Sequence, residues 1–492
     1  MPPPVDAPAA PRSLNNYIGG SWEPPAADEV LVTRNPATGE ELARVPLSAA
    51  ADVERAVAAA RAAQPGWAAT PILQRARALM DLRQVLVAHQ GELARLLATD
   101  MGKTVPDASA ELGRGIEAVE AAMAAPHMLK GEMLEGVSRG IDVEMVNQPV
   151  GVVGVITPFN FPAMIPLWFI PYAIVCGNTV VLKPSEQDPL TPERIVELIA
   201  GVDAIPPGVV NLVHGAHDAV NAILDSEGID AISFVGSAGT ARYVASRAVA
   251  TGKRVQALGG AKNSMVVMPD ADADLMVKGV SSSAFGGAGQ RCLAGSVAVL
   301  VGTEAEQDES LAGITAAAKE LRVGAGLDEA TDVCPVVSPQ ARERLEDEIE
   351  RAAEDGARVV LDGRGDGGPG GCELGPTILD LADPESRAGR EELFGPVLSI
   401  VRVPDLDAAI DWTNGSRYGN SAILFTSSGG AAQRFRQRIE AGMLGVNIGV
   451  AAPVAWFPFA GWKESMVGDL HSTGRDAFTF FTRRKVVTSR WA

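Results

Sequence analysis

Buried apolar runs alternate with helical segments in the middle of the chain, and this alternation constrains the fold most. Residues 150–156 (VGVVGVI) form a continuous apolar run, which is typical of a parallel strand covered on both faces. Pro158 and Pro162 prevent that strand from continuing. Further strands are expected at 179–182, 208–214 and 229–235, with helices at 191–200 and 239–250. Strands and helices that alternate at this spacing predict a parallel α/β sheet with right-handed crossovers.

A second α/β region begins near residue 262. Its expected strands lie at 266–268, 297–301, 398–403 and 420–425, and its expected helices at 340–355 and 406–413. The chain of 492 residues is too long for one hydrophobic core, so we expect two or three domains.

The two ends of the chain carry simpler patterns. Residues 1–13 are rich in Pro and Ala and lack an apolar core, which predicts a disordered extension and not a signal peptide. Residues 17–46 are expected to form short strands. Residues 140–149 and 477–487 are also expected to be strands, and a terminal strand of the latter kind often adds to the sheet edge of another subunit.

An Ala-rich helix is expected to follow the first strands. It begins at Ala49 with Ser48 as its cap, and Pro65-Gly66 is expected to stop it. Helical spacing resumes at 74–101 and at 108–123.

Charge and cysteine usage exclude several classes of function. With 61 acidic against 42 basic residues, the net charge of -19 argues against binding to nucleic acid or to an anionic membrane surface. The four cysteines lie far apart without metal-ligand spacing, so we expect no metal site and no disulfide framework, and a reducing cytoplasm fits best. Prolines interrupt the apolar run 159–175, which favours a buried segment over a membrane span.

A glycine-rich stretch at 285–296 (FGGAGQRCLAGS) contains the most reactive candidate side chain. Arg291 directly precedes Cys292, and a thiol beside a cation can be held as the nucleophilic thiolate. The alternative is a buried cysteine that acts as a small hydrophobe in a glycine-rich turn. These residues by themselves leave both interpretations open.

Polar residues follow two neighbouring strands of the first sheet. Thr157 and Asn160 come after the strand 150–156, and Lys183 and Glu186 come after the strand 179–182. The strand ends at one edge of a parallel sheet are where such folds bind ligands. A carboxylate past the second strand suits a ribose diol and would repel a 2′-phosphate, so NAD is favoured over NADP.

The phosphate end of such a dinucleotide site has a weaker signal. Gly236-Ser237 opens a helix, and the free N–H groups there suit a pyrophosphate. The G-x-G-x-x-G fingerprint is missing, because Gly151 and Gly154 lie inside the strand and not after it. Spacing by itself therefore supports a dinucleotide site only weakly.

Longer motifs add a resemblance to a known family. ITPFNFP, GNTVVLKPSE, ISFVGS, GQRC and EELFGPV occur in this order between residues 156 and 397, and from residue 17 to 491 the chain resembles the aldehyde dehydrogenase superfamily. The segments ELGRGIEAVE, PHMLKGE, PFNFPAMIPLW, GKRVQ, GAKNSMVVMPDA and AGQRC are similar to its CoA-acylating methylmalonate-semialdehyde (malonate-semialdehyde) dehydrogenases.

The resemblance implies an aldehyde dehydrogenase-like α/β fold with two parallel α/β (Rossmann-like) domains and a small oligomerisation element. The implied divisions are the extension 1–13, an NAD-binding domain 14–257 with an oligomerisation hairpin near 126–149, a catalytic domain 258–461, and a C-terminal segment with an oligomerisation strand at 462–492.

The resemblance also implies a role for individual residues. Cys292 would attack the aldehyde carbonyl, and Asn160 with the N–H of Cys292 would form the oxyanion hole. Arg114 and Arg291 would bind the substrate carboxylate, and Arg291 could help to keep Cys292 ionised; the alternative is that both arginines form ordinary ion pairs. The residues implied in NAD binding are Thr157, Phe159, Lys183, Glu186, Gly236, Ser237, Glu392 and Phe394.

Three departures from the family pattern are notable. Leu258, preceded by Ala257, stands where hydrolytic relatives carry a glutamate, so we expect no general base for hydrolysis there. Ala241 replaces a glycine that is often found on the helix after Gly236-Ser237. Residues 451–459 match the branch only loosely.

The sequence therefore predicts an NAD-dependent, CoA-acylating oxidoreductase for malonate or methylmalonate semialdehyde, with coenzyme A as acyl acceptor. We expect a cytoplasmic homo-oligomer, either a dimer or a tetramer. Two alternatives stay open: a hydrolytic aldehyde dehydrogenase for another acidic aldehyde, and a non-catalytic NAD-binding relative.

Overall fold

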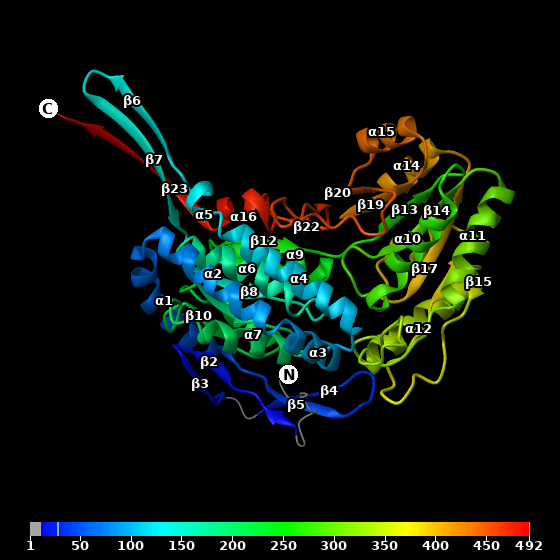
Figure 1. The fold of residues 1–492 in the computed structure, drawn as a ribbon, viewed down its shortest axis with the longest axis horizontal. Coiled ribbons are helices and arrows are strands. Elements are labelled where there is room, and N and C mark those ends of the chain that lie inside the picture. The colour runs from blue at the N-terminus through cyan, green and yellow to red at the C-terminus, as the bar shows by residue number, and fades with distance from the viewer. Residues whose placement is uncertain (1–10, 27–28, 492) are drawn as a thin grey trace.

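The computed structural model describes residues 11–26 and 29–491. Two large sheets form the two lobes of the molecule (Figure 1). The first sheet has eight strands in the order β22-β12-β11-β8-β9-β10-β2-β3, and its five central strands, β12 to β10, run parallel. Its strands are β2 (Asn16–Ile18), β3 (Ser21–Glu23), β8 (Val152–Ile156), β9 (Thr179–Lys183), β10 (Val210–Leu212), β11 (Ala231–Val235), β12 (Arg254–Leu258) and β22 (Met466–Val467).

Helices cover both faces of this sheet, as its continuous apolar strands predict. Alternate residues of β8 face opposite sides of the sheet and belong to different hydrophobic clusters. Val152 and Ile156 pack with α1, α8 and α9, whereas Val153 and Val155 pack with α2–α4, α6 and α7. The helices are α1 (Ala50–Ala69), α2 (Ile72–Ala88), α3 (Gln90–Asp100), α4 (Val105–Ala122), α5 (Ala125–Met128), α6 (Met164–Val175), α7 (Leu190–Ala200), α8 (His217–Asp225) and α9 (Ala238–Ala250). No helix among the described residues is long and apolar enough to cross a membrane.

The second sheet has seven strands in the order β15-β16-β17-β14-β13-β19-β20, and all its pairs except β15–β16 are parallel. Its strands are β13 (Asn263–Val267), β14 (Gly295–Val301), β15 (Arg358–Leu361), β16 (Thr377–Asp380), β17 (Val397–Val403), β19 (Ser421–Phe425) and β20 (Met443–Val446). Its helices are α10 (Ala273–Phe285), α11 (Glu304–Lys319), α12 (Pro339–Glu354), α13 (Arg387–Arg390), α14 (Leu406–Asn414) and α15 (Gly429–Arg438).

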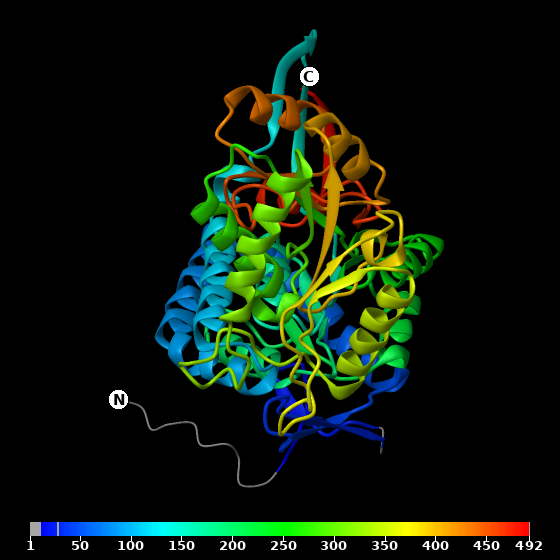
Figure 2. The ribbon, with the colours of Figure 1, turned by 90° about the vertical axis from the view of Figure 1, so that its right-hand side faces the viewer.

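A third sheet, β23-β7-β6, projects from the first lobe as a long arm that stands clear of the body in both views (Figures 1 and 2). It consists of β6 (Glu132–Ser138), β7 (Ile141–Pro149) and β23 (Thr482–Arg490). The C-terminal strand thus pairs antiparallel with β7 of its own chain. A small sheet of β1 (Arg12–Ser13), β5 (Glu41–Pro46) and β4 (Val30–Arg34) lies at the opposite end.

Segment 462–467 connects the two lobes. Its strand β21 (Trp462–Lys463) pairs with β18 (Tyr418–Gly419), and β22 then joins the edge of the first sheet beside β12.

Three local predictions are wrong. Helix α1 continues through Pro65-Gly66, because the buried Trp67 is anchored by its indole N–H on the carbonyl of Ile174. Ser48 does not cap α1; its hydroxyl accepts a hydrogen bond from Asn16. The segment 477–487 is a strand only from residue 482, because the preceding residues belong to α16 (Gly474–Phe480).

The predicted N-terminal extension is only partly described. Residues 1–10 lie outside the described residues, whereas Arg12–Ser13, which the sequence assigned to the extension, form β1 beside β5.

Candidate active site

Cys292 follows a tight turn between α10 and β14. Gly287, Ala288 and Gly289 have φ angles of 59°, 52° and 65°, in the left-handed region that favours glycine. A Cβ atom on Gly289 would lie 2.1 Å from the carbonyl oxygen of Gly395, so no larger residue fits there. The glycines of this motif therefore build the turn that carries Cys292.

Two cavities meet at Cys292. The first, of about 290 Å³, is lined by Arg114, Arg291 and several apolar side chains, and we name it the arginine cavity. The second, of about 280 Å³, is lined by Gly236 and Ser237 at the start of α9, and we name it the α9 cavity. Because Cys292 lines both, a group held in either cavity can reach its sulfur.

The Cys292 thiol is not held as a thiolate in this structure. Burial raises the pKa of Cys292 to about 12, and the nearby carboxyl of Glu392 acts in the same direction. The Arg291 charge lowers that pKa, as the sequence predicted, but by less than burial raises it. The predicted effect of Arg291 is thus present in direction but smaller than that of burial, and the thiol must lose its proton when it reacts.

Asn160 lies in the loop after β8 and lines the α9 cavity together with Cys292. Its side-chain amide donates to the carbonyl of Gln290 at 3.0 Å, two residues before Cys292. Its own carbonyl accepts from the buried Lys103 ammonium at 2.6 Å, and Lys103 is paired with Glu111. Glu111 also accepts from two N–H groups at the start of α6, so the Asn160 loop is braced on both sides.

Arg114 lies in the middle of α4 and faces the arginine cavity. Its guanidinium forms an ion pair with Glu117 at 2.8 Å, and its side chain is 40% exposed. Glu117 also accepts from the N–H of Ala455, which ties α4 to the loosely matched segment 451–459. A carboxylate ligand in the cavity would therefore share Arg114 with Glu117.

Arg291 enters the same cavity from the other side. Its guanidinium donates to the carbonyls of Ser282 and Ser283 at the end of α10, and burial lowers its pKa. Its Nε is buried and has no hydrogen-bond partner among the described residues. An unpaired buried donor of this kind is costly to the folded state.

Six of the predicted cofactor residues end or follow strands at one edge of the first sheet, whereas Glu392 and Phe394 lie in the second lobe, between α13 and β17. Lys183 and Glu186 form an ion pair at 2.9 Å after β9, and the N–H of Thr157 donates to the Lys183 carbonyl. The parallel register Ile156↔Lys183 and Phe234↔Ile156 brings the ends of β9, β8 and β11 together. The residues of the predicted set that line the α9 cavity are Phe159, Gly236, Ser237, Glu392 and Phe394.

These residues fit a dinucleotide. Ser237 caps α9, a helix of thirteen residues, so the amides of its first turn border the cavity where a pyrophosphate would lie. The Thr157 hydroxyl is buried without a partner among the described residues. Ala241 does not line the cavity; it is buried in the core, so its departure from glycine leaves the cavity unchanged.

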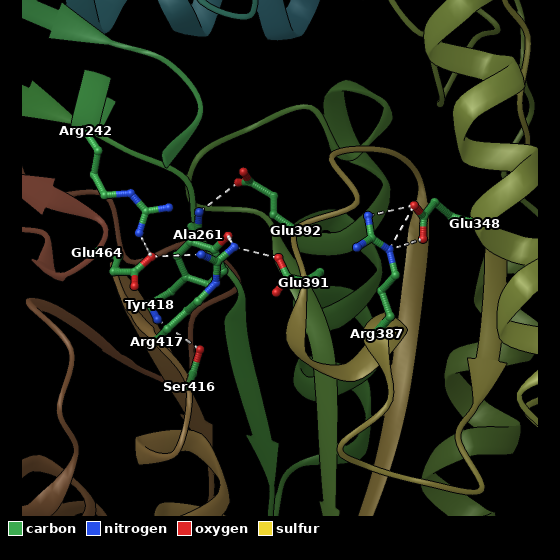
Figure 3. Close-up of polar contacts among 10 residues, drawn as sticks. All are labelled: Arg242, Ala261, Glu348, Arg387, Glu391, Glu392, Ser416, Arg417, Tyr418 and Glu464. Atoms are coloured by element: carbon green, nitrogen blue, oxygen red, sulfur yellow. Dashed lines mark hydrogen bonds and ion pairs between the residues drawn. The ribbon is translucent and has the colours of Figure 1, made fainter. Parts of the chain in front are cut away.

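Glu392 lines the α9 cavity from the second lobe. One carboxylate oxygen accepts from the N–H of Ala261 at 2.8 Å, and burial raises the pKa of Glu392 to about 7. Its neighbour Glu391 is paired with Arg417 at 2.6 Å (Figure 3). Glu392 is thus a carboxyl group that titrates near neutral pH beside the cavity.

An ion-pair network joins the two lobes beside this cavity (Figure 3). Arg417 binds both Glu391 and Glu464, and Arg242 on α9 binds Glu464 from the first lobe. Glu464 lies in the connecting segment 462–467, so the network holds that segment against both lobes.

Leu258 is the last residue of β12 and is buried in the core, and it lines neither cavity. No carboxylate therefore enters the site from this position. The carboxyl groups that do line the two cavities are those of Asp107, Glu111, Glu117 and Glu392.

Sequence reasoning missed several residues of the site. Arg344 on α12 lines the α9 cavity beside Glu392, and Asp107 and Glu117 bring acidic charge into the arginine cavity. Helical spacing offers a signal for Glu117, since it follows Arg114 by three residues on one helix. Nothing in the sequence pattern places Arg344 near a cavity, because α12 is a charged surface helix.

Comparisons with known proteins agree with this geometry. The family model described as "Aldehyde dehydrogenase family" matches residues 22–487. A malonate-semialdehyde dehydrogenase of Geobacillus kaustophilus is 49% identical over 480 residues, which cover 97% of this chain and 98% of the relative. A malonate-semialdehyde dehydrogenase of Halalkalibacterium halodurans is 47% identical and covers 98% of this chain and 99% of the relative.

Solved structures share the whole fold. A methylmalonate-semialdehyde dehydrogenase from Oceanimonas doudoroffii has a TM-score of 0.95 and 44% identity, covering 98% of this chain and 99% of the other. A Sinorhizobium meliloti chain solved in complex with NAD has a TM-score of 0.96 and 42% identity, covering 98% of this chain and 99% of the other.

Proposed function

The chain belongs to the aldehyde dehydrogenase family of oxidoreductases, and from that premise we propose that it oxidises malonate or methylmalonate semialdehyde with NAD and CoA. The products would be CO2 and acetyl-CoA or propanoyl-CoA. The observation that carries the proposal is the arginine cavity, where Arg114 and Arg291 lie with Cys292 around a space of about 290 Å³. The names of the relatives from Geobacillus and Oceanimonas support the same substrates.

The first half of the reaction uses the two cavities together. The Cys292 sulfur attacks the aldehyde carbonyl and loses its proton, and the Asn160 amide with the Cys292 N–H would donate to the oxyanion that forms. The substrate carboxylate would accept from Arg114 and Arg291, which both line the arginine cavity. Bound NAD would supply the hydride acceptor when the oxyanion collapses to the Cys292 thioester. Lys183 and Glu186 would hold the adenine ribose of the cofactor, Gly236 and Ser237 its pyrophosphate, and Glu392 and Phe394 its nicotinamide end.

The second half discharges the thioester on Cys292. The β-carboxylated acyl group loses CO2, and the resulting carbanion is protonated. Because the acyl group occupies the arginine cavity, CoA would approach Cys292 through the α9 cavity once the reduced cofactor has left. The CoA thiol then forms the new thioester bond, and the Cys292 sulfur leaves with a proton.

Three wider assignments belong to the same proposal. We propose the domain division 14–257, 258–461 and 462–492, since β12 ends the first sheet at 258 and β13 begins the second at 263. We propose a homo-oligomer, a dimer or a tetramer, formed through the arm β23-β7-β6, because the side chains of Met133, Leu134 and Val486 on that arm are 63–66% exposed.

We propose a cytoplasmic location, which suits the four unpaired cysteines.

Product analysis tests the proposed function. The enzyme is incubated with NAD and each semialdehyde, with and without CoA, and NADH, CO2 and acyl-CoA are measured. We expect equal amounts of all three products with CoA present.

The Cys292→Ser variant should bind NAD and form no NADH, because a neutral hydroxyl is a much weaker nucleophile than a thiolate. A free carboxylic acid as product would instead support a hydrolytic enzyme, and NAD binding without NADH in the wild type would support a non-catalytic relative.

A further inference from the structure

Two side-chain amides converge on the carbonyl oxygen of Cys292. The Nδ2 of Asn263 donates to it at 2.9 Å, and the Nδ2 of Asn420 donates to it at 2.8 Å. Asn263 also donates to the carbonyl of Ala294 at 2.9 Å. The backbone on the C-terminal side of the nucleophile is therefore held at two points by side chains that lie far away in the sequence.

Both amides are fixed by the centre of the second sheet. Asn263 is the first residue of β13, and Asn420 directly precedes β19, its parallel neighbour. The Oδ1 of Asn263 accepts from the N–H of Ser421 at 3.0 Å, which sets the orientation of that amide because a backbone N–H can only donate. Asn263 is 2% exposed and Asn420 4%, so neither amide is free to turn toward solvent.

We propose that Asn263 and Asn420 are positioning residues for the attack of Cys292, an inference that rests on the proposed function. The turn before Cys292 consists of left-handed residues and has no regular ladder to hold it, so its position depends on such contacts. A clamped carbonyl restricts rotation about the Cys292 backbone, and with it the direction of the sulfur and of the N–H that would donate to the oxyanion. A misplacement of about 1 Å at a reacting group can cost about 100-fold in rate.

A carbonyl oxygen accepts up to two hydrogen bonds, and the carbonyl oxygen of Cys292 receives both from buried side-chain amides next to the reacting sulfur. The same two residues lie at the starts of two paired strands, Asn263 in β13 and Asn420 just before β19, so both donors are anchored on one sheet. Loss of either amide should therefore affect the reaction rate much more than it affects NAD binding.

The test uses the full-length variants Asn263→Ala, Asn420→Ala and the double variant. The rate constant of the first NADH turnover is measured with malonate semialdehyde, together with the Kd for NAD and the Tm. We expect the rate constant to fall by about 10–100-fold for each single variant. The double variant should lose less than the product of the two single losses, because both amides hold the same oxygen. The Kd for NAD should change by less than about 3-fold, because neither Asn263 nor Asn420 lines the α9 cavity.

Asn178→Ala is the matched control. Asn178 is fully buried, its amide donates to the carbonyls of Ala173 and Phe481 at 2.9 Å, and its Oδ1 accepts from the N–H of Gly151, but it lines neither cavity. This variant should lower the Tm at least as much and leave the rate constant of the first turnover within 2-fold. If Asn263→Ala and Asn420→Ala behave like Asn178→Ala, the two residues hold only the fold and the proposal is overturned.

A second measurement separates this inference from the proposed function. The rate at which iodoacetamide alkylates Cys292 is followed by mass spectrometry in the same variants, since alkylation needs no semialdehyde and no CoA. A clamp on Cys292 predicts that this rate changes by at least about 5-fold in the single variants and stays unchanged in Asn178→Ala. An unchanged alkylation rate overturns the inference, whereas a wild type that forms no NADH with either semialdehyde overturns only the proposed function.

Discussion

At the scale of single residues, the charge balance of the arginine cavity decides how strongly it can bind a carboxylate. Lys103, Arg114 and Arg291 supply three cations, and Asp107, Glu111 and Glu117 supply three acids to the same lining. The buried pair Lys103–Glu111 is engaged with the Asn160 loop. A substrate carboxylate therefore depends on Arg114, which it shares with Glu117, and on Arg291.

Replacement of Arg114 by Leu should weaken binding of carboxylated semialdehydes selectively. Because the Arg114 side chain is 40% exposed, its contact with the substrate is partly screened, and we expect the KM for malonate semialdehyde to rise about 10-fold, or about 1.4 kcal/mol. The KM for propanal should stay within 2-fold. Glu117→Gln should have the opposite effect on malonate semialdehyde, since it frees the guanidinium.

Arg83→Leu is the matched control for this prediction. Arg83 forms a similar half-exposed ion pair with Glu120, at 2.5 Å, but does not line the cavity. Equal KM changes for malonate semialdehyde and propanal in Arg114→Leu would show that Arg114 supports the fold and does not read the carboxylate.

At the scale of elements, the sequence predicted those segments whose pattern is set locally. The buried strands at 150–156 and 179–182 were predictable, because a continuous apolar run has few alternatives in a parallel sheet. The continuation of α1 through Pro65-Gly66 could not be predicted. It depends on the hydrogen bond from Trp67 to the carbonyl of Ile174, which lies 107 residues away in the sequence. The change from α16 to β23 was missed for the same reason: Phe478 packs on Tyr172 at 5.0 Å, and packing of this kind outweighs β propensity.

The site shows the same division between local and distant causes. The motif GQRC placed Cys292 correctly beside Arg291, and the strand-end loops placed Asn160, Lys183 and Glu186 at one sheet edge. The pKa of Cys292 could not be predicted, because it depends on burial by residues from both lobes. The clamp from Asn263 and Asn420 also depends on the pairing of β13 with β19, which no local pattern reveals.

The arm β23-β7-β6 gives a prediction at this scale. Met133 and Leu134 on β6 are 66% and 64% exposed, which is unusual for side chains of this size on a projecting sheet. If they bind a second copy of the chain, the double substitution Met133→Asp and Leu134→Asp should weaken association by about 100-fold or more, since each buried side chain contributes about 1.5–3 kcal/mol.

Sedimentation analysis checks this prediction, with the 51.2 kDa chain as the mass of one subunit. Val249→Asp on α9, which is 63% exposed and lies outside the arm, serves as the control. An unchanged mass in the double variant would mean that the arm does not carry the association.

At the scale of the whole molecule, two lobes and the segment that connects them place one sulfur between two cavities. The first sheet presents its strand ends to the α9 cavity, and the second sheet carries the turn with Cys292. The network of Arg242, Glu464, Arg417 and Glu391 holds the lobes together beside that cavity (Figure 3). Because position 258 is a leucine that lines neither cavity, no carboxyl group reaches Cys292 from the end of β12.

The central claim is that an acyl group stays on Cys292 until CoA removes it, and a rapid-mixing measurement of NADH formation tests it most directly. Enzyme and excess NAD are mixed with malonate semialdehyde, first without and then with CoA. Because position 258 supplies no base that could activate water, discharge without CoA should be slower by about 10²–10⁴-fold, so we predict a burst of one NADH per active site followed by slow turnover. Addition of CoA should restore fast steady turnover. Rapid formation of many NADH per site without CoA would contradict the acyl-transfer account and favour a hydrolytic enzyme.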